Sequence, residues 1–147
     1  MALDLVTSRC LVSQEMEEAI KEGIIKTPSI DLESRIQPSS FEPIIGDEVW
    51  VIDTETGGLF RPSDHEPVYR TLLQLPGKRR QKFSLINGFE LKEGFSYLFK
   101  LEEKFALPKN IGIRASPKSS QGRIFNSSKF MTDYNNSFNK VAAAYHL

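Results

Sequence analysis

Hydrophobic and polar positions along the chain predict one short helix near the N-terminus. Met16, Ala19 and Ile20 recur at the spacing of one helix face. Ser13 is a candidate N-cap, three glutamates follow it where the helix dipole is positive, and Gly23 is placed to end the helix. We expect this helix to contribute to packing and not to catalysis.

The rest of the chain alternates between apolar runs and turn residues, which is typical of short β-strands. Strands are predicted at 47–53, 82–86, 95–101, 110–115 and 124–132. The aromatic residues of these strands are expected to be buried, although a surface that stacks on single-stranded nucleic acid would show the same alternation; they are Trp50, Phe95, Tyr97 and Phe99. The pattern predicts a mainly β domain with a short N-terminal helix.

Two polar segments are interpreted as surface loops. Residues 54–66 mix Pro and Gly with acidic residues and His65, and we expect a variable loop there. The basic cluster 78–82 follows Pro76-Gly77, so we expect it to lie in a solvated turn. Contact between this cluster and a triphosphate or nucleic acid is the alternative interpretation.

Length and charge limit the possible functions. The 147 residues have room for one domain, 1–147. Lys and Arg number 19, as do Asp and Glu, so the net charge favours neither nucleic acid nor a membrane as partner. A binding site for an anion would have to be a local concentration of positive charge.

Cysteine usage indicates a cytoplasmic protein. Cys10 is the only cysteine, so no intrachain disulfide can form. The first eleven residues are interrupted by Asp4 and Arg9 and do not form a signal peptide. No apolar run approaches the ~18 residues of a membrane helix.

The segment 115–123, Ala-Ser-Pro-Lys-Ser-Ser-Gln-Gly-Arg, carries the most informative chemistry of the sequence. Ser119 and Ser120 offer hydroxyl donors to phosphate oxygens, Lys118 and Arg123 offer positive charge, and Gly122 allows close approach of the backbone to a ligand. The spacing of a P-loop is not found anywhere in the chain. A connecting loop without a ligand is the alternative interpretation of this 115–123 motif.

Two ordered motifs resemble those of a known family. The run 105–134 contains Leu107-Pro108, an alternating strand, the 115–123 motif and Thr132-Asp133. The earlier run 36–42 reads Ile-Gln-Pro-Ser-Ser-Phe-Glu and is followed by Gly46. Together they resemble the N-terminal part of the two-domain branch of the dCTP deaminases, in the dUTPase-like superfamily. The resemblance covers most of the chain and is weakest over 54–82.

The resemblance implies a fold, an activity and a set of site residues. The fold would be a distorted jelly roll or β-barrel of the dUTPase-like type, with homotrimers that form active sites between subunits. The activity would convert dCTP to dUTP and ammonia. Ser119 and Arg123 would be catalytic, orienting the water and the base. Substrate and phosphate would be bound by Lys118, Ser120, Gln121, Gly122 and Asp133.

The sequence departs from the family pattern at three places. Glu42-Pro43 stands where Asp-Leu is usual, and Asn139 stands where an Asp commonly faces the deoxyribose. The family also continues, past a segment here represented by 144–146, into a strand that bears the catalytic glutamate. We therefore expect this chain to be a fragment that lacks this residue and is completed by a missing C-terminal segment or by assembly.

The mechanism implied by the resemblance uses no zinc. The His-x-Glu and Pro-Cys-x-x-Cys motifs of zinc deaminases are not found in the sequence, so no metal site is expected in the protein itself. Mg²⁺ would arrive with the nucleotide triphosphate. Two alternatives stay open: a dUTP diphosphatase, and a catalytically inactive nucleotide-binding or structural domain.

Overall fold

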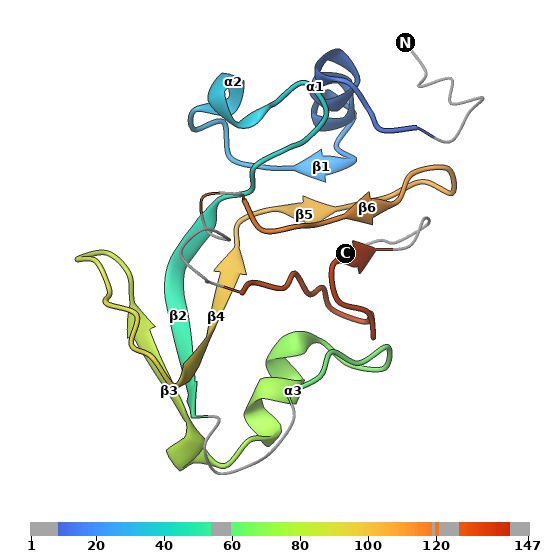
Figure 1. Cartoon of the computed structure of the whole chain (residues 1–147). Helices are drawn as coiled ribbons and strands as arrows, with labels where there is room; N and C mark the ends of the chain where they lie inside the picture. Colours follow the sequence, from blue (N-terminus) through green and yellow to red (C-terminus); the bar gives the residue numbers. More distant parts are fainter. Residues whose placement is uncertain (1–8, 54–59, 119, 121–126, 142–147) are drawn as a thin grey trace. The chain divides into compact units, whose positions relative to one another are not determined.

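The computed structural model describes residues 9–53, 60–118, 120 and 127–141. Figure 1 shows strands and short helices connected by long irregular segments. The elements run in the order α1 (Ser13–Lys21), β1 (Ile25–Lys26), α2 (Leu32–Arg35), β2 (Ile45–Asp53), α3 (Val68–Gln74), the 3-10 turn η1 (Gly77–Arg79), β3 (Arg80–Ser84), β4 (Phe95–Leu101), β5 (Lys104–Phe105), β6 (Ile113–Arg114) and β7 (Lys140–Val141). The prediction of a mainly β fold with a short N-terminal helix is confirmed.

The chain divides into two compact units, which we call unit 1 and unit 2. Among the described residues, unit 1 contains 9–46 and 100–111, and unit 2 contains 47–53, 60–99, 112–118, 120 and 127–141. Each has its own buried apolar residues: Met16, Ala19, Leu107 and Ile111 in unit 1, and Val49, Ile52, Leu72 and Val141 in unit 2.

Helix α1 has the predicted apolar face, since Met16 and Ala19 are buried. Its C-terminus is also as predicted: Gly23 adopts a φ of 75°, its N–H donates to the Ile20 carbonyl, and the Ile24 N–H donates to the Ala19 carbonyl. The predicted N-cap is wrong. Val12 occupies that position, and its N–H donates to the Glu15 carboxylate, because the helix begins at Ser13 itself.

Strand β1 of unit 1 follows this helix and pairs antiparallel with β5. Ile25 lies opposite Phe105, and the Ala106 N–H donates to the Ile24 carbonyl, which extends the pairing by one step. The short ladder joins the two stretches of sequence that form unit 1.

A three-stranded sheet has the order β3-β2-β4, and β2 pairs antiparallel with β3. The predicted strand 95–101 has the same bounds as β4, and 47–53 is extended by two residues in β2. The predicted strand 82–86 begins and ends two residues earlier, as β3. Val49 and Ile52 of β2 are buried in unit 2.

Two predicted strands are shortened or missing. Only Ile113–Arg114 of the predicted strand 110–115 is extended, as β6, because the Ile111 N–H turns back to the Pro108 carbonyl. Strand β6 pairs antiparallel with β7, and Ile113 lies opposite Val141. Residues 127–132, the described part of the predicted strand 124–132, are irregular.

Aromatic residues are less buried than predicted. Phe95 is 44% exposed, and Tyr97 and Phe99 are half-buried. Trp50 is half-buried against Tyr69, with 6.3 Å between ring centroids. The end of the sheet that bears Phe95 therefore stays open to solvent.

The basic cluster 78–82 is more ordered than a solvated turn. Arg79 Nη2 donates to the Asp53 carbonyl at 3.0 Å, and Arg80 Nε donates to the Leu75 carbonyl at 3.0 Å. Lys82 lies in β3 and forms an ion pair with Glu48 of β2. The prediction of a solvated loop is wrong for Arg79 and Arg80, because both are half-buried and donate to main-chain carbonyls. Lys82 is exposed, as predicted.

Over the described part of the chain, every helix is too short or too polar to cross a membrane.

Candidate functional site

The lead into the 115–123 motif is a strand, as predicted, although a short one. β6 pairs with β7, and the next residue, Ala115, donates its N–H to the Asn139 carbonyl at 2.9 Å. Lys118 and Ser120 are exposed to solvent. These two side chains are therefore accessible to a ligand, at the end of a strand that is fixed by pairing.

Four of the predicted site residues lie outside the described residues: Ser119, Gln121, Gly122 and Arg123. The structure describes the other three, Lys118, Ser120 and Asp133, and all of them belong to unit 2. Their roles toward a ligand stay predictions.

Asn139 joins the two sides of the segment that contains this motif. On one side its carbonyl accepts from Ala115, and on the other its N–H donates to the Phe130 carbonyl at 2.8 Å. The side-chain Oδ1 accepts a second bond from the Phe130 N–H at 2.7 Å. Three backbone-directed hydrogen bonds therefore hold residues 115 and 130 to one residue.

The Asp133 side chain is half-buried and stabilises the start of α3. Its Oδ1 accepts the N–H of Val68, the first residue of α3, at 2.7 Å. A carboxylate is favourable there because the first N–H groups of a helix have no partner within the helix. The neighbouring Tyr134 donates its N–H to the Glu66 carbonyl at 3.3 Å, so this turn is attached to the start of α3 at two points.

In unit 1 the run 36–42 forms a closed turn. The Gln37 N–H donates to the Ser40 carbonyl at 2.9 Å, the Glu42 N–H donates to the Arg35 carbonyl at 2.9 Å, and Ile36 and Phe41 form an isolated antiparallel bridge. The guanidinium of Arg35 also lies over the Phe41 ring, 5.2 Å from its centroid.

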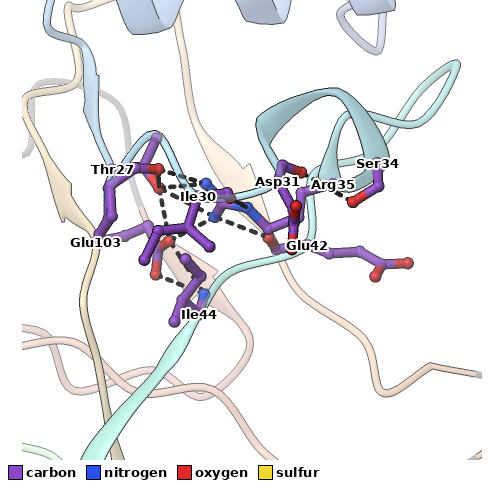
Figure 2. A network of polar contacts seen from close by, with 9 residues as sticks. Thr27, Ile30, Asp31, Ser34, Arg35, Glu42, Ile44 and Glu103 are labelled. Carbon is purple, nitrogen blue, oxygen red and sulfur yellow. Dashed lines mark hydrogen bonds and ion pairs between the residues drawn. The ribbon is translucent and has the colours of Figure 1, made fainter.

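Arg35 and Glu103 form a buried ion pair beside this turn, shown in Figure 2. Arg35 Nη1 lies 3.1 Å from Glu103 Oε1, and the side chains are 9% and 0% exposed. Both charges are surrounded by hydrogen-bonding groups. The Arg35 guanidinium donates to Thr27 Oγ1 and to the carbonyls of Pro28, Ile30 and Glu42, and the Glu103 carboxylate accepts from the Thr27 hydroxyl and from the Ile44 N–H.

Sequence reasoning missed this pair. Arg35 and Glu103 are ordinary charged residues in the sequence, and the first of them only borders the motif 36–42. No short-range signal connects residues 68 positions apart. Only the folded chain brings them together, where they hold the turn 36–42 and the start of β2 in place.

Across 9–53, 60–118, 120 and 127–141, no three or more His, Cys, Asp or Glu side chains are grouped so that they could hold a metal ion. The exposed Lys118 ammonium and Ser120 hydroxyl are suited to binding an anion.

Comparisons with known proteins give the same family that the motifs 36–42 and 115–123 resemble. The family model of the 2′-deoxycytidine 5′-triphosphate deaminase (DCD) N-terminal domain matches residues 8–147. No curated protein matches. Among solved structures, 2′-deoxycytidine 5′-triphosphate deaminase from Agrobacterium tumefaciens is similar, with a TM-score of 0.78 and 26% sequence identity over 93% of this chain.

The match spans 39% of the Agrobacterium tumefaciens chain, so this chain corresponds to about two-fifths of that protein. The family model covers nearly all of the sequence, from before α1 to residue 147. The expected family and the expected N-terminal position within it are both confirmed. The chain belongs to the family of 2′-deoxycytidine 5′-triphosphate deaminase N-terminal domains.

Proposed function

We propose that this chain is the N-terminal part of a cytoplasmic enzyme that hydrolyses dCTP to dUTP and ammonia. The match of the deaminase N-terminal domain over residues 8–147 carries this proposal. The similar fold of the Agrobacterium tumefaciens deaminase supports it.

In the proposed reaction, water adds to C4 of the cytosine ring and the exocyclic amine leaves as ammonia. A carboxylate outside this chain takes one proton of the attacking water and passes it to N3 of the ring. It then takes the proton of the added hydroxyl and gives it to the leaving amine, so the carboxylate is regenerated in each cycle. Ser119 orients the water, and the Arg123 guanidinium stabilises the charge that develops on the ring. No zinc is used in this scheme.

The triphosphate is bound by the 115–123 motif in this proposal. Lys118 and Ser120 are exposed and can reach an anion from solvent. Lys118 supplies a point charge, while the backbone of Gln121 and Gly122 approaches the phosphates closely. The nucleotide brings its own Mg²⁺, which binds phosphate oxygens and water and needs no dedicated protein ligands.

We assign two roles to Asp133, one in the fold and one toward the substrate. Its Oδ1 fixes the start of α3, and the same carboxylate borders the substrate site and contacts a polar group of the nucleotide. Completion of the site takes place by homotrimer formation or through a segment beyond residue 147.

The experiment is a product assay with dCTP, dUTP and CTP in the presence of Mg²⁺. Ammonia release and nucleotide products are measured for this chain and for a form extended at its C-terminus. We expect the extended form to convert dCTP to dUTP, and this chain alone to bind dCTP without turnover.

Other products would identify other functions. Pyrophosphate released from dUTP without ammonia would indicate a diphosphatase. Tight dCTP binding without turnover by either form would indicate a binding module. If neither form binds or converts any of the three nucleotides, the proposal is wrong.

A further inference from the structure

Arg114 and Lys140 lie directly opposite each other in the β6–β7 ladder of unit 2. The neighbouring pair of this ladder is Ile113 and Val141, of which Val141 is 1% exposed and Ile113 is half-buried. Because side chains alternate between the two faces of paired strands, Arg114 and Lys140 share the outer face, and both are exposed. The outer face of the ladder therefore presents two cations side by side.

Two like charges in this arrangement are unfavourable for the fold. Directly opposite residues of antiparallel strands have Cβ atoms about 5 Å apart, and like charges at such positions destabilise the pairing. In the β2–β3 pairing the cation Lys82 forms an ion pair with Glu48. Within the part of the chain that the structure describes, neither Arg114 nor Lys140 has a carboxylate partner of this kind. These residues leave the repulsion between the two cations uncompensated.

The stretches that surround the ladder are positively charged. Residues 112–118, 120 and 127–141 contain one acidic residue, Asp133, whose Oδ1 accepts the Val68 N–H at the start of α3. The same stretches contain four cations: Arg114, Lys118, Lys129 and Lys140. In a chain whose net charge is zero, this is a local concentration of positive charge, which is what attracts an anion.

We propose that Arg114 and Lys140 together bind a phosphate group on the outer face of the β6–β7 ladder. The planar Arg114 guanidinium can donate two parallel hydrogen bonds to phosphate oxygens, and the Lys140 ammonium supplies a compact charge beside it. An anion between the two side chains replaces their mutual repulsion by two attractions. Binding of the anion and stability of the ladder are therefore coupled.

Two sources can supply the phosphate group, the triphosphate of a nucleotide and free inorganic phosphate. For the nucleotide, the inference rests on the proposed function and adds two residues to those that bind the triphosphate. Nucleic acid is a poorer match, because its binding depends on many phosphate contacts and a pair of cations supplies few of them. The proposed ligand is thus a small phosphate compound.

Calorimetry with inorganic triphosphate in low salt tests the site. We expect Arg114→Gln and Lys140→Gln each to raise the Kd about fivefold, because each removes one charge-assisted contact. Lys140→Arg keeps the charge and should keep the Kd within about twofold. Arg70→Gln and Lys92→Gln are the matched controls, since both residues are exposed, lie in unit 2 and change the net charge equally. We expect these controls to leave the Kd within about twofold.

Thermal unfolding supplies a readout that needs no ligand. In low salt, Arg114→Gln and Lys140→Gln should each raise Tm, because each substitution relieves the repulsion. The gain should shrink in high salt, where exposed charges are screened. Triphosphate should raise the Tm of the unsubstituted protein more than that of either variant. A purely structural role of the two side chains predicts the opposite, a lower Tm after substitution.

Four results would overturn the inference. The first is an equal Kd for triphosphate in the unsubstituted protein, Arg114→Gln and Lys140→Gln. The second is equal weakening by Arg70→Gln and Lys92→Gln, which marks a general effect of charge. The third is a lower Tm of both site variants in low salt, because the two cations are then stabilised within the protein. The fourth is tighter binding of a single-stranded DNA oligomer than of triphosphate, which indicates a nucleic-acid surface.

Titrations with dCTP and Mg²⁺, deoxycytidine and inorganic orthophosphate identify the source of the phosphate group. If both substitutions weaken dCTP and neither orthophosphate nor deoxycytidine binds, the source is the nucleotide. If both substitutions weaken orthophosphate and leave dCTP unaffected, the source is free phosphate.

The same variants separate this inference from the proposed function. If the extended form converts dCTP to dUTP and both substitutions leave triphosphate binding unchanged, only the role of Arg114 and Lys140 fails. If both substitutions weaken triphosphate binding and the extended form converts no nucleotide, only the proposed function fails.

Discussion

The Arg35 guanidinium and the Glu103 carboxylate meet at 3.1 Å with side chains that are 9% and 0% exposed. Their other hydrogen-bonding positions are filled by Thr27 and by backbone groups of the turn around 28–44. A pair of this kind depends on both partners, because the loss of one leaves the other charge buried without compensation.

Glu103→Ala is therefore expected to destabilise the protein by about 3–5 kcal/mol. The measurement is the free energy of unfolding in urea. Glu48→Ala is the matched control, since Glu48 pairs with Lys82 at the surface, with side chains 46% and 45% exposed. Its expected cost is below about 1 kcal/mol. Equal costs for the two substitutions would contradict the buried role of Glu103.

Gly46→Ala tests the close approach of β2 to the end of β4 and to Glu102, which follows it. A Cβ at Gly46 would lie 2.5 Å from Glu102 Oε1 and 3.2 Å from the Lys100 carbonyl oxygen. The Glu102 side chain can move away, but the backbone of Lys100 is held in the sheet, so we expect a loss of about 1–3 kcal/mol. Gly77→Ala meets no atom within 4 Å and should stay within about 0.5 kcal/mol of wild type in the same urea experiment. A neutral Gly46→Ala would show that the sheet adapts freely.

The structural role of Asp133 can be tested separately from its proposed contact with the substrate. Asp133→Ala removes the acceptor of the Val68 N–H and should cost about 1 kcal/mol of stability. Asp133→Asn keeps an acceptor and should cost less, in parallel thermal and urea unfolding. If Asp133→Asn preserves stability but weakens dCTP binding, the carboxylate has a role toward the ligand; if stability and binding fall together in both variants, its role is confined to α3.

Lys118→Ala should raise the Kd for dCTP with Mg²⁺ severalfold, because one exposed cation is removed from the proposed phosphate site. Lys92→Ala is the control, as Lys92 is also exposed, lies in unit 2 and changes the net charge equally. Calorimetry at two salt concentrations measures the effect. Equal Kd values for wild type and Lys118→Ala would remove Lys118 from the site.

The N-terminus of α1 should weaken in acid. Hydrogen bonds from Arg9, one of them at 2.7 Å, and from the Val12 N–H lower the pKa of Glu15 to about 2 from its ordinary value of 4.5. Because the folded pKa is the lower one, this contribution to stability is present above pH 4.5 and is lost as pH falls toward 2.

Unfolding in urea over this pH range checks the Glu15 contribution against Glu15→Gln, which does not titrate. The difference in stability between wild type and Glu15→Gln should shrink as pH falls. A difference that stays constant down to the folded pKa would show that the interaction with Arg9 does not depend on the charge of Glu15.

Elements with strong local signals could be predicted from the sequence. The strand Phe95–Leu101 was predicted with its observed bounds, and Gly23 was correctly placed at the end of α1. Both depend on neighbours in sequence: alternating side chains in one case and the conformational freedom of glycine in the other.

Elements that depend on distant partners were missed. Helix α3 begins with Val68 and Tyr69, which are weak helix formers, and its first N–H is satisfied by Asp133, 65 positions away. The pairing of Arg35 with Glu103 is equally non-local. The candidate site was predicted from the resemblance of the 115–123 motif and of Asp133 to a known family. The hydrogen bond from the Val68 N–H to Asp133 could not be predicted from that resemblance.

In the described part of the chain, unit 1 is formed by two separate stretches, 9–46 and 100–111, and this has a consequence for the newly made chain. Arg35 is synthesised 68 positions before Glu103, so at usual elongation rates of about 5–20 residues per second it waits for several seconds without its partner. Throughout that interval the Arg35 guanidinium lacks its carboxylate partner, and the first part of unit 1 stays open on the ribosome. Folding of this unit is thus expected to be timed by the emergence of residue 103 and to occur after most of unit 2 has been translated.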